Sequence, residues 1–396
     1  MKIYLNYSVR EALQKRLELI FNEFEEVVVS VSGGKDSTVL FYEAFRVAKK
    51  LGRLPINVFW IDQEAEWQST EDIIKKWMYK KGVRPFWLQI PMKITNATSM
   101  NVDFLDCWNP YKEKDWIRPK DKISIKKNTY GTDRFYELFE AFFKKHFGHK
   151  KTATLSGVRA EESPARFLGL TAGNTYKGIT WGRKYPEKNL KTFYPLYDWS
   201  YLDVWKYIYK NNLEYNKVYE AQYKLGTPIK NMRVSNFNHE TAVNNLFEVQ
   251  QIEPNTHNKI LNRITGSHAA TKAGKTNYFP KTLPYMFKDW REYRNFLLEK
   301  LVTNPEHKLG FKKTFFSQDL QFEHFSNRKY TSILKAHVRG ILANDWENSS
   351  ILHNLWINNE SEETQKAKAI KKEFLKKTGL WEKLVEEGVA VENKRT

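Results

Sequence analysis

Cysteine is almost absent from this chain, which has 396 residues and a single thiol, Cys107. One thiol excludes an intramolecular disulfide, a zinc site built mainly of thiolates and a four-cysteine iron–sulfur cluster. We therefore expect neither zinc nor an iron–sulfur cluster as a cofactor. Cys107 lies in an Asp-Cys-Trp-Asn context, where the expected role is that of a small buried apolar side chain.

Long apolar runs are absent too, and no stretch approaches the length needed to span a bilayer. The first residues, Met-Lys-Ile-Tyr-Leu-Asn-Tyr, precede a charged helical pattern and lack the features of a signal peptide. We therefore expect a cytoplasmic protein with no membrane partner. A chain of 396 residues is long enough for two or three domains.

Acidic residues are outnumbered, since 65 Lys and Arg face 46 Asp and Glu and the formal net charge is +19. Such an excess attracts polyanions whatever their sequence, so nucleic acid is a reasonable partner or substrate. The alternative is a basic protein whose dispersed lysines are merely hydrated. Residues 93–150 look like an insertion, and its basic stretch 112–127 is interpreted as a structured surface loop in preference to a lid or a nucleic-acid contact.

The most informative segment joins an apolar β-branched run, residues 27–31, to a Ser-Gly-Gly-Lys-Asp-Ser turn at 32–37. A helical pattern follows, whose apolar face comprises Val39, Leu40, Ala44, Phe45 and Val47. Adjacent glycines let consecutive backbone amides point at an anion, and the helix start adds its positive dipole end. This segment therefore predicts a cradle for the phosphates of a nucleotide, against the alternative of a solvated glycine turn.

The side chains of this segment add hydroxyl donors and one positive charge. The candidate phosphate-binding residues are Ser30, Ser32, Gly33, Gly34, Lys35, Ser37 and Thr38. The turn is not a Walker A motif, because its glycines are adjacent and an Asp follows the Lys.

Strands and helices alternate after the phosphate loop. Residues 56–61 read as a buried strand that ends at Asp62, followed by a helix over 70–81 and a third strand over 85–90. This order predicts an α/β fold with a parallel sheet flanked by helices. Ligands of such sheets bind at the carboxyl ends of the strands, where the phosphate loop and Asp62 fall.

The pattern becomes mainly helical beyond about residue 236. We therefore expect an α/β nucleotide-binding domain over residues 1–235 and a mainly helical basic domain over 236–396. Helices are expected within the second domain at 285–302, 332–344 and 361–387.

Three blocks follow one another between about residues 25 and 210. They are Ser32-Gly33-Gly34-Lys35-Asp36-Ser37; Ser156-Gly157-Val158-Arg159 with Glu161-Glu162-Ser163 and Arg166; and Pro195-Leu196-Tyr197-Asp198-Trp199 with Asp203-Val204-Trp205. In this order and spacing they resemble the phosphoadenosine phosphosulfate (PAPS) reductase branch of the PP-loop ATP pyrophosphatase superfamily, whose fold is adenine nucleotide alpha hydrolase-like. The run Asp62-Gln63-Glu64-Ala65-Glu66-Trp67 and the long C-terminal extension resemble the YbdN/IbrA-like group, which implies a functional partnership with a ParB-like protein.

The resemblance implies ATP or a related adenine nucleotide, together with Mg²⁺. Members of the superfamily grip the β,γ-pyrophosphate of ATP and direct attack at the α-phosphorus, which releases pyrophosphate. We expect Asp62, Gly157 and Glu162 to join the phosphate loop in binding the nucleotide. The expected catalytic residues are Lys35, Asp36, Arg159 and Arg166.

Several of these roles have a structural alternative. Asp36 would orient Lys35, help to hold Mg²⁺, or simply stabilise a helix start as an N-terminal carboxylate. Asp62 would contact the ribose or a metal, or cap a helix. Arg159 and Arg166 would converge on one anion, with Ser163 as the cap of the intervening helix, or would form surface ion pairs with neighbouring glutamates.

The aromatic and histidine side chains carry weaker signals. Trp199 is equally compatible with stacking on a base and with a place in the core. His239, His257 and His268 lack metal-ligand spacing and are interpreted as scattered surface or core residues.

One departure separates the chain from true PAPS reductases. Attack on the sulfonate sulfur needs a cysteine nucleophile near the C-terminus, and no cysteine follows Cys107. The leading hypothesis is therefore an ATP-dependent, adenylyl-forming enzyme that acts on an unknown acceptor. The alternatives are sulfur transfer onto a nucleotide or nucleic acid, and a non-catalytic nucleotide-sensing regulator that acts with the ParB-like partner.

Overall fold

The computed structural model describes residues 6–171, 175–184, 188–240, 242–323, 327–348, 351 and 362–390. The chain divides into two compact units. Unit 1 comprises residues 1–94, 105–237 and 248–263, and unit 2 comprises residues 95–104, 238–247 and 264–396. Among the described helices, none combines the length and apolar character needed to cross a membrane.

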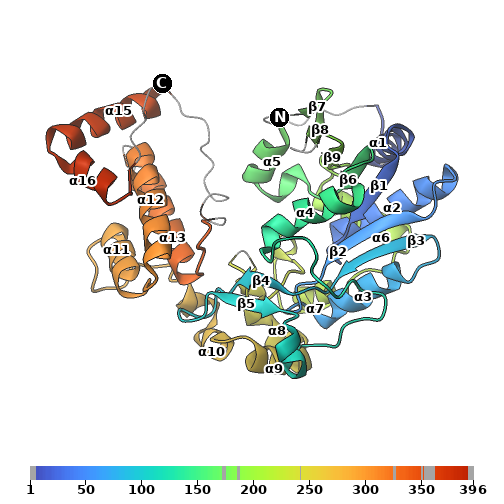
Figure 1. The fold of residues 1–396 in the computed structure, drawn as a ribbon, viewed down its shortest axis with the longest axis horizontal. Helices are drawn as coiled ribbons and strands as arrows, with labels where there is room; N and C mark the ends of the chain where they lie inside the picture. Colours follow the sequence, from blue (N-terminus) through green and yellow to red (C-terminus); the bar gives the residue numbers. More distant parts are fainter. Residues whose placement is uncertain are drawn as a thin grey trace. The chain divides into compact units, whose positions relative to one another are not determined.

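Unit 1 is built on a seven-stranded sheet with the order β3-β2-β1-β6-β9-β8-β7 (Figure 1). Its strands are β1 (Glu26–Ser30), β2 (Ile56–Ile61), β3 (Val83–Leu88), β6 (Thr152–Leu155), β7 (Thr175–Tyr176), β8 (Ile179–Lys184) and β9 (Leu190–Phe193). The five strands from β3 to β9 are parallel, whereas β8 pairs antiparallel with both β9 and β7. The expected α/β fold with a parallel sheet is confirmed.

Helices cover both faces of this sheet (Figure 1). Unit 1 contains α1 (Val9–Glu23), α2 (Lys35–Lys50), α3 (Gln68–Met78), α4 (Phe135–Phe147), α5 (Pro164–Thr171), α6 (Tyr201–Lys210), α7 (Val218–Lys224) and α9 (Pro254–Arg263); α8 (Leu246–Ile252) precedes α9. Short 3₁₀ helices lie at Pro110–Asp115, Ala160–Glu162, Ile229–Asn231 and Val243–Asn245. A two-stranded sheet pairs β4 (Met92–Thr95) with β5 (Phe104–Cys107).

Strand β2 contributes side chains to the packing on both faces of the sheet. Val58 and Trp60 enter the core cluster shared with α1, α2, α3 and α6. Phe59 points the other way, toward α4, where its ring lies 4.5 Å from that of Phe142. Phe86 of β3 also packs on Phe142, at 5.5 Å. Helix α4, within the segment 93–150, is thus part of the crossover connection that joins parallel strands β3 and β6.

Two boundaries in this region differ from the sequence expectation. Helix α3 begins at Gln68 instead of residue 70, because the Glu253 carboxylate accepts hydrogen bonds from the amides of Gln68, at 2.7 Å, and Ser69, at 3.0 Å. Those amides are among the four that a helix start leaves unpaired. Strand β3 lies at 83–88 instead of 85–90, because all six of its residues pair with the six residues of β2.

Unit 2 is mainly helical in its described part. Its helices are α10 (Ser267–Tyr278), α11 (Trp290–Lys300), α12 (Pro305–Phe322), α13 (Asn327–Leu342), α15 (Glu362–Lys377) and α16 (Leu380–Glu386). The expected helix over 361–387 is interrupted at Gly379, which adopts a φ of +69° and ends α15. Helix α11 starts later than the expected residue 285, because the Asp289 side chain accepts a hydrogen bond from the Glu292 amide and caps it there.

Candidate functional site

The turn between β1 and α2, residues 31–34, requires its glycines for steric reasons. Gly33 has a φ of +67°, and a Cβ atom there would lie 2.9 Å from Thr70 Cγ2 on α3. A Cβ atom on Gly34 would lie 3.2 Å from the hydroxyl of Tyr219 on α7. A side chain at Gly33 would be strained and would clash with α3, and one at Gly34 would require Tyr219 to move by a few tenths of an ångström.

Several amides at this turn are available to a ligand. The Ser32 amide donates to Ser37 Oγ at 3.3 Å, and the Lys35 amide donates to the Tyr219 hydroxyl at 3.0 Å. No described residue accepts a hydrogen bond from the amides of Gly33, Gly34 and Asp36. Unpaired amides at the start of a 16-residue helix form a local site for an anion.

The hydroxyl groups of this segment differ in their availability. The Ser37 and Thr38 hydroxyls both donate to the Gly34 carbonyl, at 3.0 and 2.9 Å, and both side chains are buried. The Ser32 hydroxyl lies 3.4 Å from Ser37 Oγ. Ser30 ends β1 and is partly buried beside β2, where Phe59 is its register partner. Ser32 thus lies in the turn itself, while the Ser37 and Thr38 hydroxyls are both committed to the first turn of α2.

Three charged side chains meet at the start of α2. The Lys35 ammonium lies 3.0 Å from one carboxylate oxygen of Asp36, and Arg159 Nε lies 2.5 Å from the other. The Arg159 side chain is 4% exposed and also donates to the Trp199 carbonyl at 3.2 Å. Arg159 also pairs with the Glu161 carboxylate at 3.2 Å, so two cations and two carboxylates adjoin the open amides.

The segment after β6 supports Arg159 and approaches the phosphate loop closely. A Cβ atom on Gly157 would lie 3.1 Å from backbone atoms of Asp36 and Ser37. The Arg159 amide donates to the Glu162 carboxylate at 3.0 Å, and Glu162 pairs with Arg166 at 3.1 Å. Glu162 therefore lies between the two arginines.

Helix α5 begins at Pro164, and the Arg166 amide donates to Ser163 Oγ at 3.2 Å, as expected of a cap. The Arg166 side chain is 43% exposed and faces Glu162, whereas the Arg159 guanidinium faces Asp36. The structure thus brings Lys35, Asp36 and Arg159 together and connects Arg166 to them only through Glu162.

Asp62 lies at the end of β2 and is fully buried. Its carboxylate accepts hydrogen bonds from Trp87 Nε1 at 3.1 Å and Gln89 Nε2 at 2.9 Å. It also forms an ion pair with Arg118 at 2.6 Å and accepts from the Glu64 amide at 2.9 Å. A ligand at Asp62 would therefore have to displace one of these partners.

The residues after Asp62 form a buried charged cluster that sequence reasoning did not identify as such. Glu64 adopts a φ of +61° and pairs with Arg263, with Nε–Oε1 at 2.6 Å. Burial, reinforced by the neighbouring Asp62 carboxylate, raises the pKa of Glu66 to about 8. The partner arginines, Arg118 and Arg263, lie 56 and 199 residues away along the chain, so no local pattern reveals them.

Tyr219 is a second residue that the sequence did not indicate. It is 4% exposed, and burial raises the pKa of its hydroxyl well above the usual value. Besides accepting from the Lys35 amide, it lies under the Lys35 ammonium, 5.6 Å from the ring centre. The only signal in the sequence was the aromatic content of residues 215–223.

The remaining candidates occupy structural positions. Trp199 is 1% exposed and its indole N–H donates to the Val9 carbonyl at 3.2 Å, so the ring belongs to the core. Cys107 is buried, as expected; its thiol donates to the Gln63 carbonyl at 3.2 Å, and burial raises the pKa of the thiol well above its usual value. His257 is buried and His268 is exposed.

The carboxylates expected to bind Mg²⁺ are already neutralised by cations. Lys35 and Arg159 pair with Asp36, and Arg118 pairs with Asp62. Within the described ranges, no group of three or more His, Cys, Asp or Glu residues is arranged to hold a metal ion. Mg²⁺ commonly takes one or two carboxylates and completes its shell with phosphates and water, so Asp36 fits such a role only alongside a bound nucleotide.

A parallel sheet, a twin-glycine turn and an open helix start together define a PP-loop α/β protein. The sequence profile of the phosphoadenosine phosphosulfate reductase domain matches residues 26–226, and the chain belongs to this family. A second profile, a domain of unknown function (DUF3440), matches residues 226–337.

The chain is also similar in sequence to individual proteins. The chain is 28% identical over 315 residues to the uncharacterized protein YbdN of Escherichia coli, an alignment that covers 76% of this chain and 77% of YbdN. It is 26% identical over 215 residues to sulfate adenylyltransferase subunit 2 of Shewanella pealeana, covering 50% of this chain and 62% of that protein. Among solved structures, FMN adenylyltransferase of Candida glabrata, in complex with FMN and the ATP analogue AMPCPP, matches with a TM-score of 0.36 at 15% identity, covering 60% of this chain and 66% of that one.

Proposed function

We propose that the chain binds ATP, or a related adenine nucleotide, and activates an acceptor by attack at the α-phosphorus with release of pyrophosphate. Membership of the PAPS reductase domain family supports a nucleotide-binding PP-loop enzyme at the coarse level. The name of one relative, sulfate adenylyltransferase subunit 2, describes transfer of an adenylyl group by that protein. The observation that carries the proposal is the start of α2, where open amides adjoin the Lys35–Asp36–Arg159 cluster.

In the proposed step, a nucleophilic atom of the acceptor forms a bond to the α-phosphorus while the bond to the α,β-bridging oxygen breaks. Pyrophosphate leaves with the electron pair, and the acceptor releases its proton to water. The open amides of Gly33, Gly34 and Asp36 and the Ser32 hydroxyl would hold the β,γ-pyrophosphate, while the Lys35 amide and the Ser37 hydroxyl would join them only by leaving Tyr219 and the Gly34 carbonyl. Lys35 would neutralise the charge that grows on the leaving group, a contribution of about 3 kcal/mol for one donor in a preorganised site.

The positioning residues of this proposal follow from their contacts. Asp36 would orient Lys35, and Arg159 would fix Asp36 while adding a second positive charge. Glu162 would hold the backbone of Arg159 in place and pair with Arg166 at the exposed edge of the site. The other proposed nucleotide-binding residues are Ser30, Gly33, Gly34, Thr38, Asp62 and Gly157.

Reduction of PAPS is not proposed, although the family takes its name from that reaction. The reaction needs an accessible thiolate, and the sequence has no cysteine after Cys107. Cys107 is buried, and burial keeps its thiol protonated by raising its pKa. A sulfur source from a partner protein would be required for any sulfur transfer.

The products of ATP test this proposal. The protein is incubated with Mg²⁺ and ATP labelled at the α- or the γ-phosphate, with candidate acceptors that include oligonucleotides and with a ParB-like partner. Labelled pyrophosphate together with AMP or an adenylylated acceptor is the expected result, and orthophosphate would contradict attack at the α-phosphorus. Tight binding of ATP without any turnover would instead favour a nucleotide-sensing regulator.

A further inference from the structure

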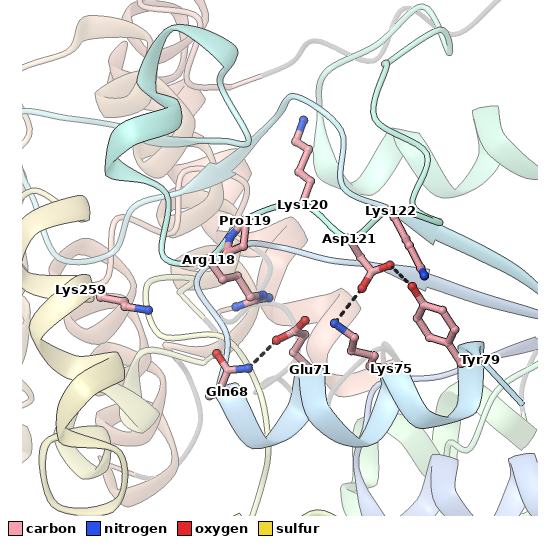
Figure 2. Close-up of a pocket in the computed structure, with 10 residues that line it drawn as sticks. All are labelled: Gln68, Glu71, Lys75, Tyr79, Arg118, Pro119, Lys120, Asp121, Lys122 and Lys259. Atoms are coloured by element: carbon pink, nitrogen blue, oxygen red, sulfur yellow. Dashed lines mark hydrogen bonds and ion pairs between the residues drawn. The ribbon is translucent and has the colours of Figure 1, made fainter.

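A cavity of about 690 Å³ lies beside α3 in unit 1. Figure 2 shows its lining, which comes from α3, from the segment 118–122 and from Lys259 on α9. From α3 the lining takes Gln68, Glu71 and Lys75, which lie on one side of the helix, and Tyr79 follows directly after its last residue. No residue of the phosphate loop belongs to the lining.

Helix α3 separates the cavity from the phosphate loop. Thr70 and Ile74 are the α3 residues nearest to Gly33. At 3.6 residues per turn, they lie roughly a third of a turn around the helix from the side that lines the cavity. The two sites therefore use different faces of the same helix.

The cavity is lined by more cations than carboxylates. Its five cationic residues are Lys75, Arg118, Lys120, Lys122 and Lys259, and its two acidic residues are Glu71 and Asp121. Asp121 is already satisfied, because Lys75 lies 2.9 Å and the Tyr79 hydroxyl 2.6 Å from its carboxylate. Burial raises the pKa of Glu71, which lowers the cost of keeping this carboxyl neutral beside an anion.

Arg118 forms the inner wall and is 5% exposed. One terminal nitrogen pairs with Asp62 at 2.6 Å and the other donates to the Glu64 carbonyl at 2.8 Å. Its Nε–H has no hydrogen-bond partner among the described residues, which is costly for a buried donor of a charged group. Because this Nε–H is itself shielded from solvent, a shift of the Arg118 side chain is needed before an anion can become its missing partner.

Two exposed lysines of the lining have no carboxylate partner among the described residues, although the Lys122 ammonium lies 5.7 Å from the centre of the Tyr79 ring. Lys122 and Lys259 are exposed, and neither forms an ion pair with any residue in the part of the chain that the structure describes. In Figure 2 the Lys259 side chain extends from α9 toward Arg118 and Gln68. The ammonium of Lys120 lies over the ring of Trp116, 4.7 Å from its centre.

We propose that this cavity binds a phosphate-bearing ligand of about nucleotide size, at a site separate from the phosphate loop. The volume falls within the range of small-molecule sites, and Arg and Lys are the residues that recognise phosphate oxygens in proteins. The ligand chemistry is a phosphate monoester on a nucleoside. It can come from a free mononucleotide or from the 5′-phosphorylated end of a nucleic-acid strand.

Binding titrations of the full chain test this site. The probes are uridine 5′-monophosphate, uridine, and a four-residue uridine oligonucleotide with and without a 5′-phosphate. The test variant is the double substitution Lys122→Ala and Lys259→Ala, which removes two exposed charges. The matched control is Lys206→Ala with Lys210→Ala, two exposed lysines of α6 outside the cavity.

We expect the double variant to weaken binding of the phosphorylated probe by about tenfold or more, which corresponds to about 1.4 kcal/mol. The control variant and Lys35→Ala should bind the phosphorylated probe with the affinity of the unmodified protein, and Glu71→Gln should bind it severalfold more tightly. Uridine, which has no phosphate, should not bind. Uridine monophosphate binding would identify a mononucleotide site, and binding of the phosphorylated oligonucleotide alone would identify a strand end. Equal affinity of the double variant and its control, or a loss in Lys35→Ala alone, would overturn the proposal.

Discussion

Asp36 lies between two cations, with the Lys35 ammonium at 3.0 Å and Arg159 Nε at 2.5 Å. Both cationic side chains are at most 11% exposed, so water screens their charges only weakly. The carboxylate fixes the direction of Lys35 before any ligand arrives. A cation held in advance where negative charge develops stabilises a transition state without reorganisation.

Lys35→Ala is expected to lower nucleotide turnover by about 10²–10³-fold, because it removes this preorganised charge. The free energy of unfolding should change little, since Asp36 keeps Arg159 as its partner and the variant loses one ion pair and one contact with the Tyr219 ring. Steady-state release of pyrophosphate and urea unfolding measure the two quantities. Lys206→Ala is the matched control on an exposed lysine. Unaltered turnover in the Lys35 variant would remove this residue from the mechanism.

Glu66 is expected to make the stability of the fold depend on pH. Its pKa rises from the ordinary 4.5 to about 8 on burial, so between these values the folded state binds one proton more than the unfolded state. Stability from this group is complete below pH 4.5 and is lost as the pH rises toward 8, at about 1.4 kcal/mol per pH unit. Urea unfolding at pH 5, 6, 7 and 8 would measure the slope.

Glu66→Gln provides the comparison, because the amide fills the same space and cannot ionise. We expect this variant to be more stable than the unmodified protein at about pH 7 and to lose that advantage near pH 5, within the window set by the two pKa values. Glu113→Gln, at an exposed carboxyl, controls for the removal of one negative charge. An identical dependence on pH in the unmodified protein and in Glu66→Gln would show that this carboxyl ionises freely.

Single residues were predicted well where their partners are near in sequence. The Ser163 cap depends on a neighbour three positions away and was expected, whereas the residues that crowd the twin glycines, Thr70 and Tyr219, are distant in the sequence and were not. The role of Asp36 stayed open, because Arg159 lies 123 residues away and only the fold brings it to 2.5 Å. The unpaired Nε–H of Arg118 is a property of packing alone and has no sequence signature.

At the scale of elements, α3 packs closely against the phosphate loop. Thr70 of α3 contacts the position where a Gly33 side chain would start, and the Thr70 hydroxyl accepts a hydrogen bond from Asn216 Nδ2 at 2.9 Å. The alternation of strands and helices was predictable from the sequence, because the spacing of apolar residues differs between the two kinds of element. The start of α3 was not, because Glu253 lies 185 residues from the Gln68 amide that it caps.

Gly33→Ala and Gly52→Ala form a matched pair of substitutions. Both glycines have a positive φ, +67° and +68°, so each alanine costs about 1 kcal/mol of backbone strain. A Cβ atom at Gly33 also meets Thr70 at 2.9 Å, whereas nothing lies within 4 Å at Gly52. We therefore expect Gly33→Ala to reduce both stability and nucleotide affinity, and Gly52→Ala to reduce stability alone. Equal losses in urea unfolding and in nucleotide titration would exclude the close approach as their cause.

For the whole molecule, charge is the property that the sequence defines most directly. The net charge of +19 arises from 65 basic and 46 acidic residues, many of which pair in unit 1 and unit 2. Composition alone cannot separate paired from unpaired cations, and only the structure shows that Lys122 and Lys259 are unpaired among the described residues while Lys75 is not.

Binding of nucleic acid, if driven by this charge, should weaken steeply as salt rises. Each phosphate that the protein neutralises on a single strand releases about 0.7 counterion, so the logarithm of the affinity falls linearly with the logarithm of salt concentration. Titrations of a labelled oligonucleotide at about 50, 100 and 200 mM salt would give the slope, with a polyanion such as heparin as the competitor. If the strand end enters the cavity, replacement of Lys122 and Lys259 by alanine should reduce the magnitude of that slope by about one to two. The control, Lys206→Ala with Lys210→Ala, should leave the slope unchanged. An affinity that is constant across this range would show that the excess positive charge does not drive the binding.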